Sequence, residues 1–232
     1  MNDLDFYAKI EPILGLNEAK NRLYEIYLDE ISNLKFSGFK GLDFGCGAGD
    51  LALRLAHKFK MLCLDKSDEM VNLALKNGLN AKNLSIFELN EKFDLIISSF
   101  DVLNYMKKDE MVEFLSKIPE LLNENGYFIF DINTKFGFEE IAQGLLYEED
   151  EDGNSLIIDA VFENEILKTD MILFEKRKDC FYKIKKTITQ VFHQKSFIQN
   201  NLNLKLLNVK NINLYSKKKA DKIIFIFKKI NN

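Results

Sequence analysis

Tryptophan is missing from this 232-residue sequence, and cysteine and histidine are scarce, with three and two residues respectively. The absence of tryptophan beside 20 phenylalanines indicates a bias of composition rather than a functional signal. The three cysteines, Cys46, Cys63 and Cys180, are odd in number and lack the spacing of metal ligands. The simplest interpretation is a reduced, cytoplasmic protein without a bound metal ion.

Long apolar runs and an excess of basic residues are also lacking. No apolar run is long enough to span a bilayer, and the N-terminal residues lack the basic and apolar regions of a signal peptide, so we expect no membrane association. The net charge of −4 disfavours nucleic acid as the main partner, because binding to phosphates requires a basic face. We therefore expect no DNA partner, and RNA is disfavoured. The lysine-rich residues 205–229 and the acidic residues 148–152 are typical of solvated faces.

A glycine-rich segment is the most informative feature that is present. Residues 41–50 read GLDFGCGAGD, so the apolar stretch 40–44 runs into Gly45, Gly47 and Gly49 before an apolar helical pattern begins. Glycines allow close approach of the backbone to a ligand, and the start of a helix directs unpaired N–H groups at an anion. A strand, a glycine turn and a helix in this order predict a nucleotide-type site.

The spacing of the glycines indicates which ligand binds. The dinucleotide fingerprint G-x-G-x-x-G would require glycine at position 50, where Asp50 stands. The observed form, D-x-G-x-G-x-G from Asp43 to Gly49, resembles the first motif of class I S-adenosylmethionine (SAM)-dependent methyltransferases. A nicotinamide oxidoreductase is accordingly the least favoured enzyme class, and a glycine turn of another α/β protein is the alternative. The resemblance implies SAM as cofactor, S-adenosylhomocysteine as product, and cofactor contacts from Asp43, Cys46 and the three glycines.

A second apolar strand, 60–64, ends at Asp65, about 20 residues beyond the glycine turn, where an acidic residue accepts hydrogen bonds from ribose hydroxyls. Ser67 or Asp68 can cap the following helix, which leaves Asp65 for the ligand. The resemblance implies adenine contacts from the residues that follow, Lys66 and Met70. It also aligns Asn83 with an Asp that accepts from the adenine amino group in most relatives, and places the backbone N–H of Leu84 at the adenine ring.

The strand 92–98 ends in Ser98, and Ser99 and Asp101 follow at the carboxyl edge of the sheet, where ligands of open α/β sheets bind. Ser99 is therefore a cofactor candidate, and Asp101 and Tyr105 are candidates for orienting or deprotonating the methyl acceptor. The segment lacks the [DN]-P-P-[FY] tetrapeptide of enzymes that methylate the amines of nucleic-acid bases. A Cys-Pro nucleophile is also absent, which disfavours covalent methylation of pyrimidine carbon.

The alternation of strands and helices predicts a Rossmann-like α/β fold, with a mostly parallel seven-stranded sheet and helices on both faces. We expect a helical cap at 1–35, a sheet core at 36–143 and 196–232, and an antiparallel β insert at 144–195 in which apolar residues alternate with polar ones. The resemblance makes Tyr7 of the cap a candidate residue over the cofactor. His193 follows the insert and is a further candidate base.

The insert resembles the lid of sugar-amine and small-amine methyltransferases, which roofs the substrate pocket. Within it, residues 148–159 resemble a calcium-binding loop but lack helical flanks, and a hairpin turn explains them better. The sequence thus predicts a monomeric or homodimeric enzyme that methylates nitrogen or oxygen of a small molecule. The alternatives are an RNA or protein methyltransferase and a SAM-binding subunit without activity.

Overall fold

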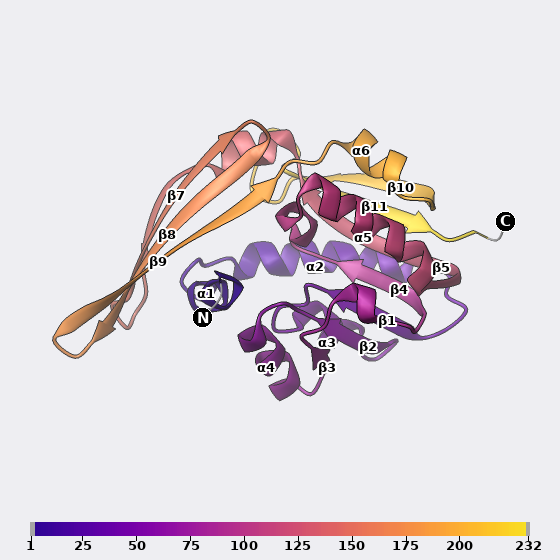
Figure 1. Cartoon of the computed structure of the whole chain (residues 1–232), viewed down its shortest axis with the longest axis horizontal. Helices are drawn as coiled ribbons and strands as arrows, with labels where there is room; N and C mark the ends of the chain where they lie inside the picture. Colours follow the sequence, from indigo (N-terminus) through magenta and orange to yellow (C-terminus); the bar gives the residue numbers. More distant parts are fainter. Residues whose placement is uncertain (1–2, 231–232) are drawn as a thin grey trace.

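The structure, a computed structural model, describes residues 3–230 and contains a seven-stranded sheet and a separate four-stranded sheet (Figure 1). The strands of the larger sheet are β1 (Lys40–Phe44), β2 (Lys60–Leu64), β3 (Asn80–Lys82), β4 (Phe93–Ser98), β5 (Leu122–Asn133), β10 (Lys205–Ile212) and β11 (Lys222–Lys228). Their order is β10-β11-β5-β4-β1-β2-β3, with β1 to β5 parallel and β11 antiparallel to both of its neighbours. The predicted α/β fold class is confirmed.

Helices cover both faces of this sheet. The helices are α1 (Asp3–Ile10), α2 (Asn17–Ser32), α3 (Asp50–Leu55), α4 (Asp68–Lys76), α5 (Lys108–Leu121) and α6 (Lys195–Asn201). Apolar side chains of α2, α3 and α4 pack on one face, and those of α5 and α6 pack on the other. Strand β4 is buried along its whole length, which explains why its centre, residues 95–97, is apolar at every position rather than alternating. In residues 3–230, every helix is too short or too polar to cross a membrane.

The second sheet extends from the first as a long arm (Figure 1). It consists of β6 (Gly144–Glu149), β7 (Ser155–Glu163), β8 (Ile166–Arg177) and β9 (Cys180–Val191), paired antiparallel in chain order. We call it the lid sheet. Residues 148–159 form its β6–β7 hairpin, whose turn closes with Gly153 N–H donating to the Asp150 carbonyl at 3.0 Å. Helix α1 packs on the lid sheet through Phe6 and Ile10.

The connections that follow β3, β4 and α5 and that lead into the lid sheet contain short elements and boundaries that apolar periodicity does not define. Strand β5 begins at Leu122, directly after α5, because Leu122 already pairs with Phe93 of β4 before the irregularity at the following residues. A short π-helical segment, η3 (Gly137–Ala142), leads from β5 into the lid sheet. Two single-turn 3-10 helices, η1 (Ile86–Glu88) and η2 (Val102–Tyr105), follow β3 and β4. The turn at η2 carries the predicted acceptor residues.

Candidate active site

The glycine turn lies at the carboxyl end of β1 and opens into a cavity of about 1080 Å³. Gly47 has a φ of +55°, and the nearest atom to a Cβ built there would be Met70 Sδ, at 4.0 Å. At Gly45, by contrast, with a φ of +73°, a Cβ would lie 2.5 Å from Val102 Cγ1. Gly45 is thus required by the left-handed backbone and by packing, whereas Gly47 leaves open space at the wall of the cavity.

Asp65 ties the glycine turn to the β2–α4 loop. Its carboxylate accepts from the backbone N–H of Gly47 and of Ser67, each at 2.9 Å. Ser67 caps α4 by accepting from Met70 N–H at 3.2 Å, as the sequence predicts. Burial raises the pKa of Asp65, and the backbone N–H groups oppose that rise by stabilising the carboxylate. Each carboxylate oxygen has a further lone pair, so Asp65 can also accept from a ligand hydroxyl.

Asp43 lies beneath the glycine turn and is 1 % exposed. Its Oδ1 atom is buried without a hydrogen-bond partner among the described residues. Burial, with the nearby charge of Asp65 as a smaller cause, raises the pKa of Asp43 to about 8. An orphaned buried carboxyl requires compensation. A cofactor that carries both an ammonium and a sulfonium charge fits this environment.

The cavity is lined by most residues that the sequence singles out. From the cofactor set these are Tyr7, Gly45, Cys46, Gly47, Asp65, Lys66, Met70, Asn83, Leu84 and Ser99, and from the acceptor set they are Asp101 and Tyr105. Asp43 and Gly49 lie behind the turn rather than in the wall. The Asn83 amide donates to Asp68 Oδ1 at 2.7 Å, which leaves its carbonyl oxygen to accept from a ligand.

His193 does not line the cavity, which disagrees with its expected role as a base. The ring is 1 % exposed, and its Nε2 atom lies 3.0 Å from the Met106 carbonyl oxygen, to which it donates. The ring also stacks on Phe197. Burial lowers the pKa of His193, so the imidazole is neutral at physiological pH. Packing of α6 against η2 and α5 encloses this side chain, a contact that the sequence pattern does not contain.

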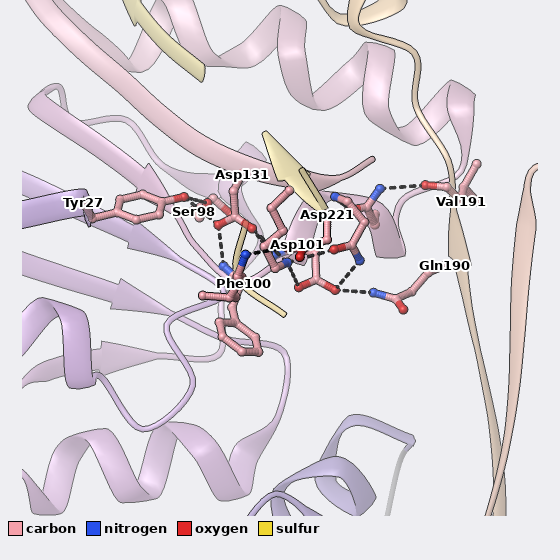
Figure 2. Close-up of polar contacts among 12 residues, drawn as sticks. Tyr27, Ser98, Phe100, Asp101, Asp131, Gln190, Val191 and Asp221 are labelled. Carbon is pink, nitrogen blue, oxygen red and sulfur yellow. Dashed lines mark hydrogen bonds and ion pairs between the residues drawn. The ribbon is translucent and has the colours of Figure 1, made fainter. Parts of the chain in front are cut away.

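Asp101 is instead held in a buried ionic network (Figure 2). The Lys222 ammonium, 1 % exposed, donates to Asp101 Oδ1 at 2.6 Å and to Asp131 Oδ2 at 3.2 Å. Asp101 Oδ2 accepts from the side-chain amides of Asn133, at 3.0 Å, and Gln190, at 2.7 Å. Three donors therefore already occupy the Asp101 carboxylate, which suits it to orient and attract an acceptor more than to take up a proton.

Asp131 fixes the backbone on which Asp101 stands. Its carboxylate accepts from the N–H groups of Phe100 and Asp101, at 2.7 and 3.0 Å, and from the Tyr27 hydroxyl at 2.7 Å (Figure 2). Phe100 and Asp101 have φ values of +65° and +55°, a conformation that costs about 1–2 kcal/mol for residues with a Cβ. The buried carboxylate offsets this strain and aims the Asp101 side chain into the cavity.

The same network joins the lid sheet to the core. Gln190 lies near the end of β9, and in the next position the carbonyl of Val191 accepts from the Asn104 amide at 2.8 Å (Figure 2). Sequence reasoning missed Lys222, Asp131 and Gln190. The sequence carries a signal for the first two, because Asp131 interrupts an apolar run and Lys222 directly precedes one, and buried charges are retained where they are paired.

Four tyrosines line the cavity, Tyr7, Tyr24, Tyr105 and Tyr215. Burial is the main cause that raises the pKa of each, and the charge of Asp101 adds to the rise for Tyr7, Tyr105 and Tyr215. Their hydroxyl groups are therefore protonated at neutral pH and donate or accept hydrogen bonds rather than act as bases.

Comparisons with known proteins agree with this geometry. The family described as methyltransferase domain matches residues 42–126. A relative from Geobacillus sp. (strain WCH70), provisionally named a methyltransferase, is 30% identical over 156 residues, 61% of this chain and 62% of the relative. The chain thus spans less than two thirds of that relative.

Two solved structures share the architecture over nearly the whole chain. A SAM-dependent methyltransferase from Clostridium acetobutylicum ATCC 824 has a TM-score of 0.81 and 22% identity, with 97% of this chain and 98% of that one covered. CalS10, a SAM-bound amino pentose methyltransferase from Micromonospora echinaspora, has a TM-score of 0.69 and 14% identity, with 97% and 96% covered. At these identities, the likeness shows a shared fold that includes the lid sheet.

Proposed function

We propose that this chain, which is similar to class I SAM-dependent methyltransferases, transfers a methyl group from SAM to nitrogen or oxygen of a small molecule. The observation that carries the proposal is one continuous cavity. It runs from the glycine turn and Asp65, past Asp101 and Tyr105, to the inner face of the lid sheet. A donor and an acceptor bound in this cavity meet beside Asp101, at the carboxyl edge of β4.

The residues of this chain would hold the cofactor in three places. The glycine turn would hold its amino-acid end, with the buried Asp43 carboxyl behind that turn, Asp65 would accept from the ribose hydroxyls, and residues 83–84 would flank the adenine. When bound, the cofactor supplies a methyl group on a positively charged sulfonium. The protein's contribution is to hold the acceptor in line with that methyl group and to exclude water. Such positioning supplies most of the rate acceleration that is available to this reaction.

The covered position of the acceptor region favours a small molecule over RNA or protein. The lid sheet and α1 stand over the cavity, and β8 and β9 contribute wall residues such as Met171 and Gln190. The likeness to an amino pentose methyltransferase supports a small acceptor as well. An open basic groove, which an RNA substrate would need, is not part of this wall within the described residues.

Calorimetry with S-adenosylhomocysteine, followed by an assay of its release against amines, sugars and bulk RNA, tests the proposal. Gly47→Ala places a methyl group at the cavity wall, whereas Gly78→Ala, with a φ of +84° and open space around it, imposes similar backbone strain outside the cavity lining. We expect both variants to lose about 1–2 kcal/mol of stability and only Gly47→Ala to bind the cofactor more weakly. Equal cofactor affinity of the two variants contradicts the assigned site, and release driven by RNA alone contradicts the small-molecule acceptor.

A further inference from the structure

The wall that the lid sheet presents to the cavity is apolar. Its apolar side chains are Leu145 and Leu146 of β6, Ile158 of β7, Leu167 and Met171 of β8, and Ile188 of β9. Ile158 pairs directly with Met171 across β7 and β8, so these two side chains form one patch on the inner face of the sheet. Two polar residues of the lid sheet also line the cavity, Thr169 and Gln190, and the Gln190 amide is already bonded to Asp101.

Helix α1 and the turn after it contribute to the same end of the cavity. Ile10 and Leu14 there are apolar, Tyr7 and Glu11 are polar, and Ile10 packs in one cluster with Met171 of the lid sheet. A ligand that binds against the inner face of the lid sheet therefore contacts hydrocarbon. A body rich in hydroxyl groups would lose water on that face without gaining partners there.

The lysines that line the cavity give no support to an anionic acceptor. Three lysines line the cavity, and Lys222 is paired with Asp101 and Asp131. Lys20 is paired with two carboxylates as well, each at 2.8 Å, and Lys66 lies on the β2–α4 loop at the cofactor end. Among the described residues, the acceptor end therefore offers no unpaired cation to a carboxylate or a phosphate.

The ionic network instead favours a cation. Lys222 neutralises one of the two carboxylates that it contacts, so the group of Lys222, Asp101 and Asp131 has a net charge of −1 when all three are ionised. The Asp101 side chain retains 15% exposure, whereas that of Asp131 has none, so the excess charge faces the cavity through Asp101. A protonated amine next to Asp101 gains from this charge, and a neutral alcohol gains less.

From this wall and this charge, we propose that the methyl acceptor is an amine on an apolar body, aliphatic or aromatic, and that the lid sheet selects it through the patch formed by Ile158, Met171 and Ile188. The inference rests on the proposed function and specifies its acceptor. The amine end lies at Asp101 and Tyr105, and the apolar body lies against the inner face of the lid sheet.

Methyl transfer starts from the ammonium form of the acceptor. The bound ammonium releases one proton to solvent water, and the freed nitrogen lone pair forms a bond to the methyl carbon. The carbon–sulfur bond breaks, its electron pair stays on sulfur, and the positive charge passes to the methylated nitrogen. Asp101 attracts the ammonium and orients the nitrogen, and the Tyr105 hydroxyl oxygen accepts one of the remaining N–H groups.

A panel of four probe types tests the inference: arylalkyl- and alkylamines such as 2-phenylethylamine, the hydroxylated amine glucosamine, the alcohol 2-phenylethanol and the anion 3-phenylpropionate. Release of S-adenosylhomocysteine is measured in each case. We expect kcat/KM for the best apolar amine to exceed that for glucosamine by about 10²-fold, the discrimination typical of a misplaced hydroxyl at an apolar wall. Equal or faster turnover of glucosamine, the alcohol or the anion overturns the inference.

Cofactor binding without turnover of any apolar amine also overturns the inference about the acceptor, but it does not contradict the assigned cofactor site. Absence of both cofactor binding and methyl transfer overturns the proposed function itself, so the two failures are distinguishable.

A pair of variants on one strand tests the wall directly. Ile188→Thr places a hydroxyl at the cavity. Ile184→Thr makes the same change four residues earlier, two periods of the strand alternation away, on the same side of β9 and outside the cavity lining. Both retain a β-branched side chain that suits a strand. We expect KM for the apolar amine to rise about tenfold in Ile188→Thr, with KM for SAM unchanged, and neither to change in Ile184→Thr. Equal effects of the two substitutions assign the change to lid packing and overturn the role of the wall.

Discussion

The Lys222 ammonium donates to Asp101 Oδ1 at 2.6 Å and thereby joins the first residue of β11 to the turn that follows β4. The two residues are 121 positions apart in the chain. Their contact exists because β11 inserts beside β5 and brings its first residue to the edge of the sheet where η2 begins. The acceptor end of the cavity is therefore complete only when the last strand has been placed.

We expect Lys222→Met to destabilise the protein by about 3–5 kcal/mol, because it removes the cation between two buried carboxylates and keeps their charges in place. Urea unfolding at neutral pH measures the change in the free energy of unfolding. Lys218→Met is the control, since Lys218 is an exposed residue of the same C-terminal region that shares no bond with the network. Equal loss of stability in the two variants would contradict the importance of the pairing.

The raised pKa of Asp43 predicts a dependence of stability on pH. Its carboxyl has a pKa of about 8 in the folded protein against 3.8 in the unfolded chain, so the folded state binds the extra proton between these values. The contribution of Asp43 is accordingly greatest below pH 3.8 and is lost as the pH rises through about 8.

Asp43→Asn removes that titration and keeps the shape of the side chain. We expect the free energy of unfolding of the wild type, measured without cofactor, to fall relative to the variant as the pH is raised from 5 to 8. Titrating groups that do not interact with Asp43 cancel in the difference, which therefore reports Asp43 together with its coupling to Asp65. Parallel pH curves for wild type and variant would rule out an ionisable, uncompensated Asp43.

The position of His193 predicts that it takes no part in proton transfer. His193→Gln retains a donor for the Met106 carbonyl and loses the ring stacking, so we expect a stability loss of about 1 kcal/mol. The pH dependence of kcat for the methyl acceptor should keep its shape and midpoint, because the ring lies outside the cavity lining. Loss of a titrating limb from the pH–rate profile of this variant would restore His193 as a candidate base.

The local pattern of the sequence was sufficient for the cofactor end. The glycine turn, the strand before it, Asp65 and the cap at Ser67 all lie within 30 residues, and each follows from turn chemistry or from apolar periodicity. The sequence also predicted the helices on both faces and the lid hairpins, because the period of apolar residues changes from helical to alternating after β5.

The acceptor end required the tertiary structure. Asp101 obtains its partners from β5, β9 and β11, and nothing in the sequence near Asp101 indicates that Lys222 or Gln190 approaches it. His193, a plausible base by residue type, is withdrawn from the cavity by the packing of a helix that is distant in sequence from η2. Backbone conformation and hydrophobic period are local properties of a chain, whereas burial and the pairing of charges depend on which distant segments the fold brings together.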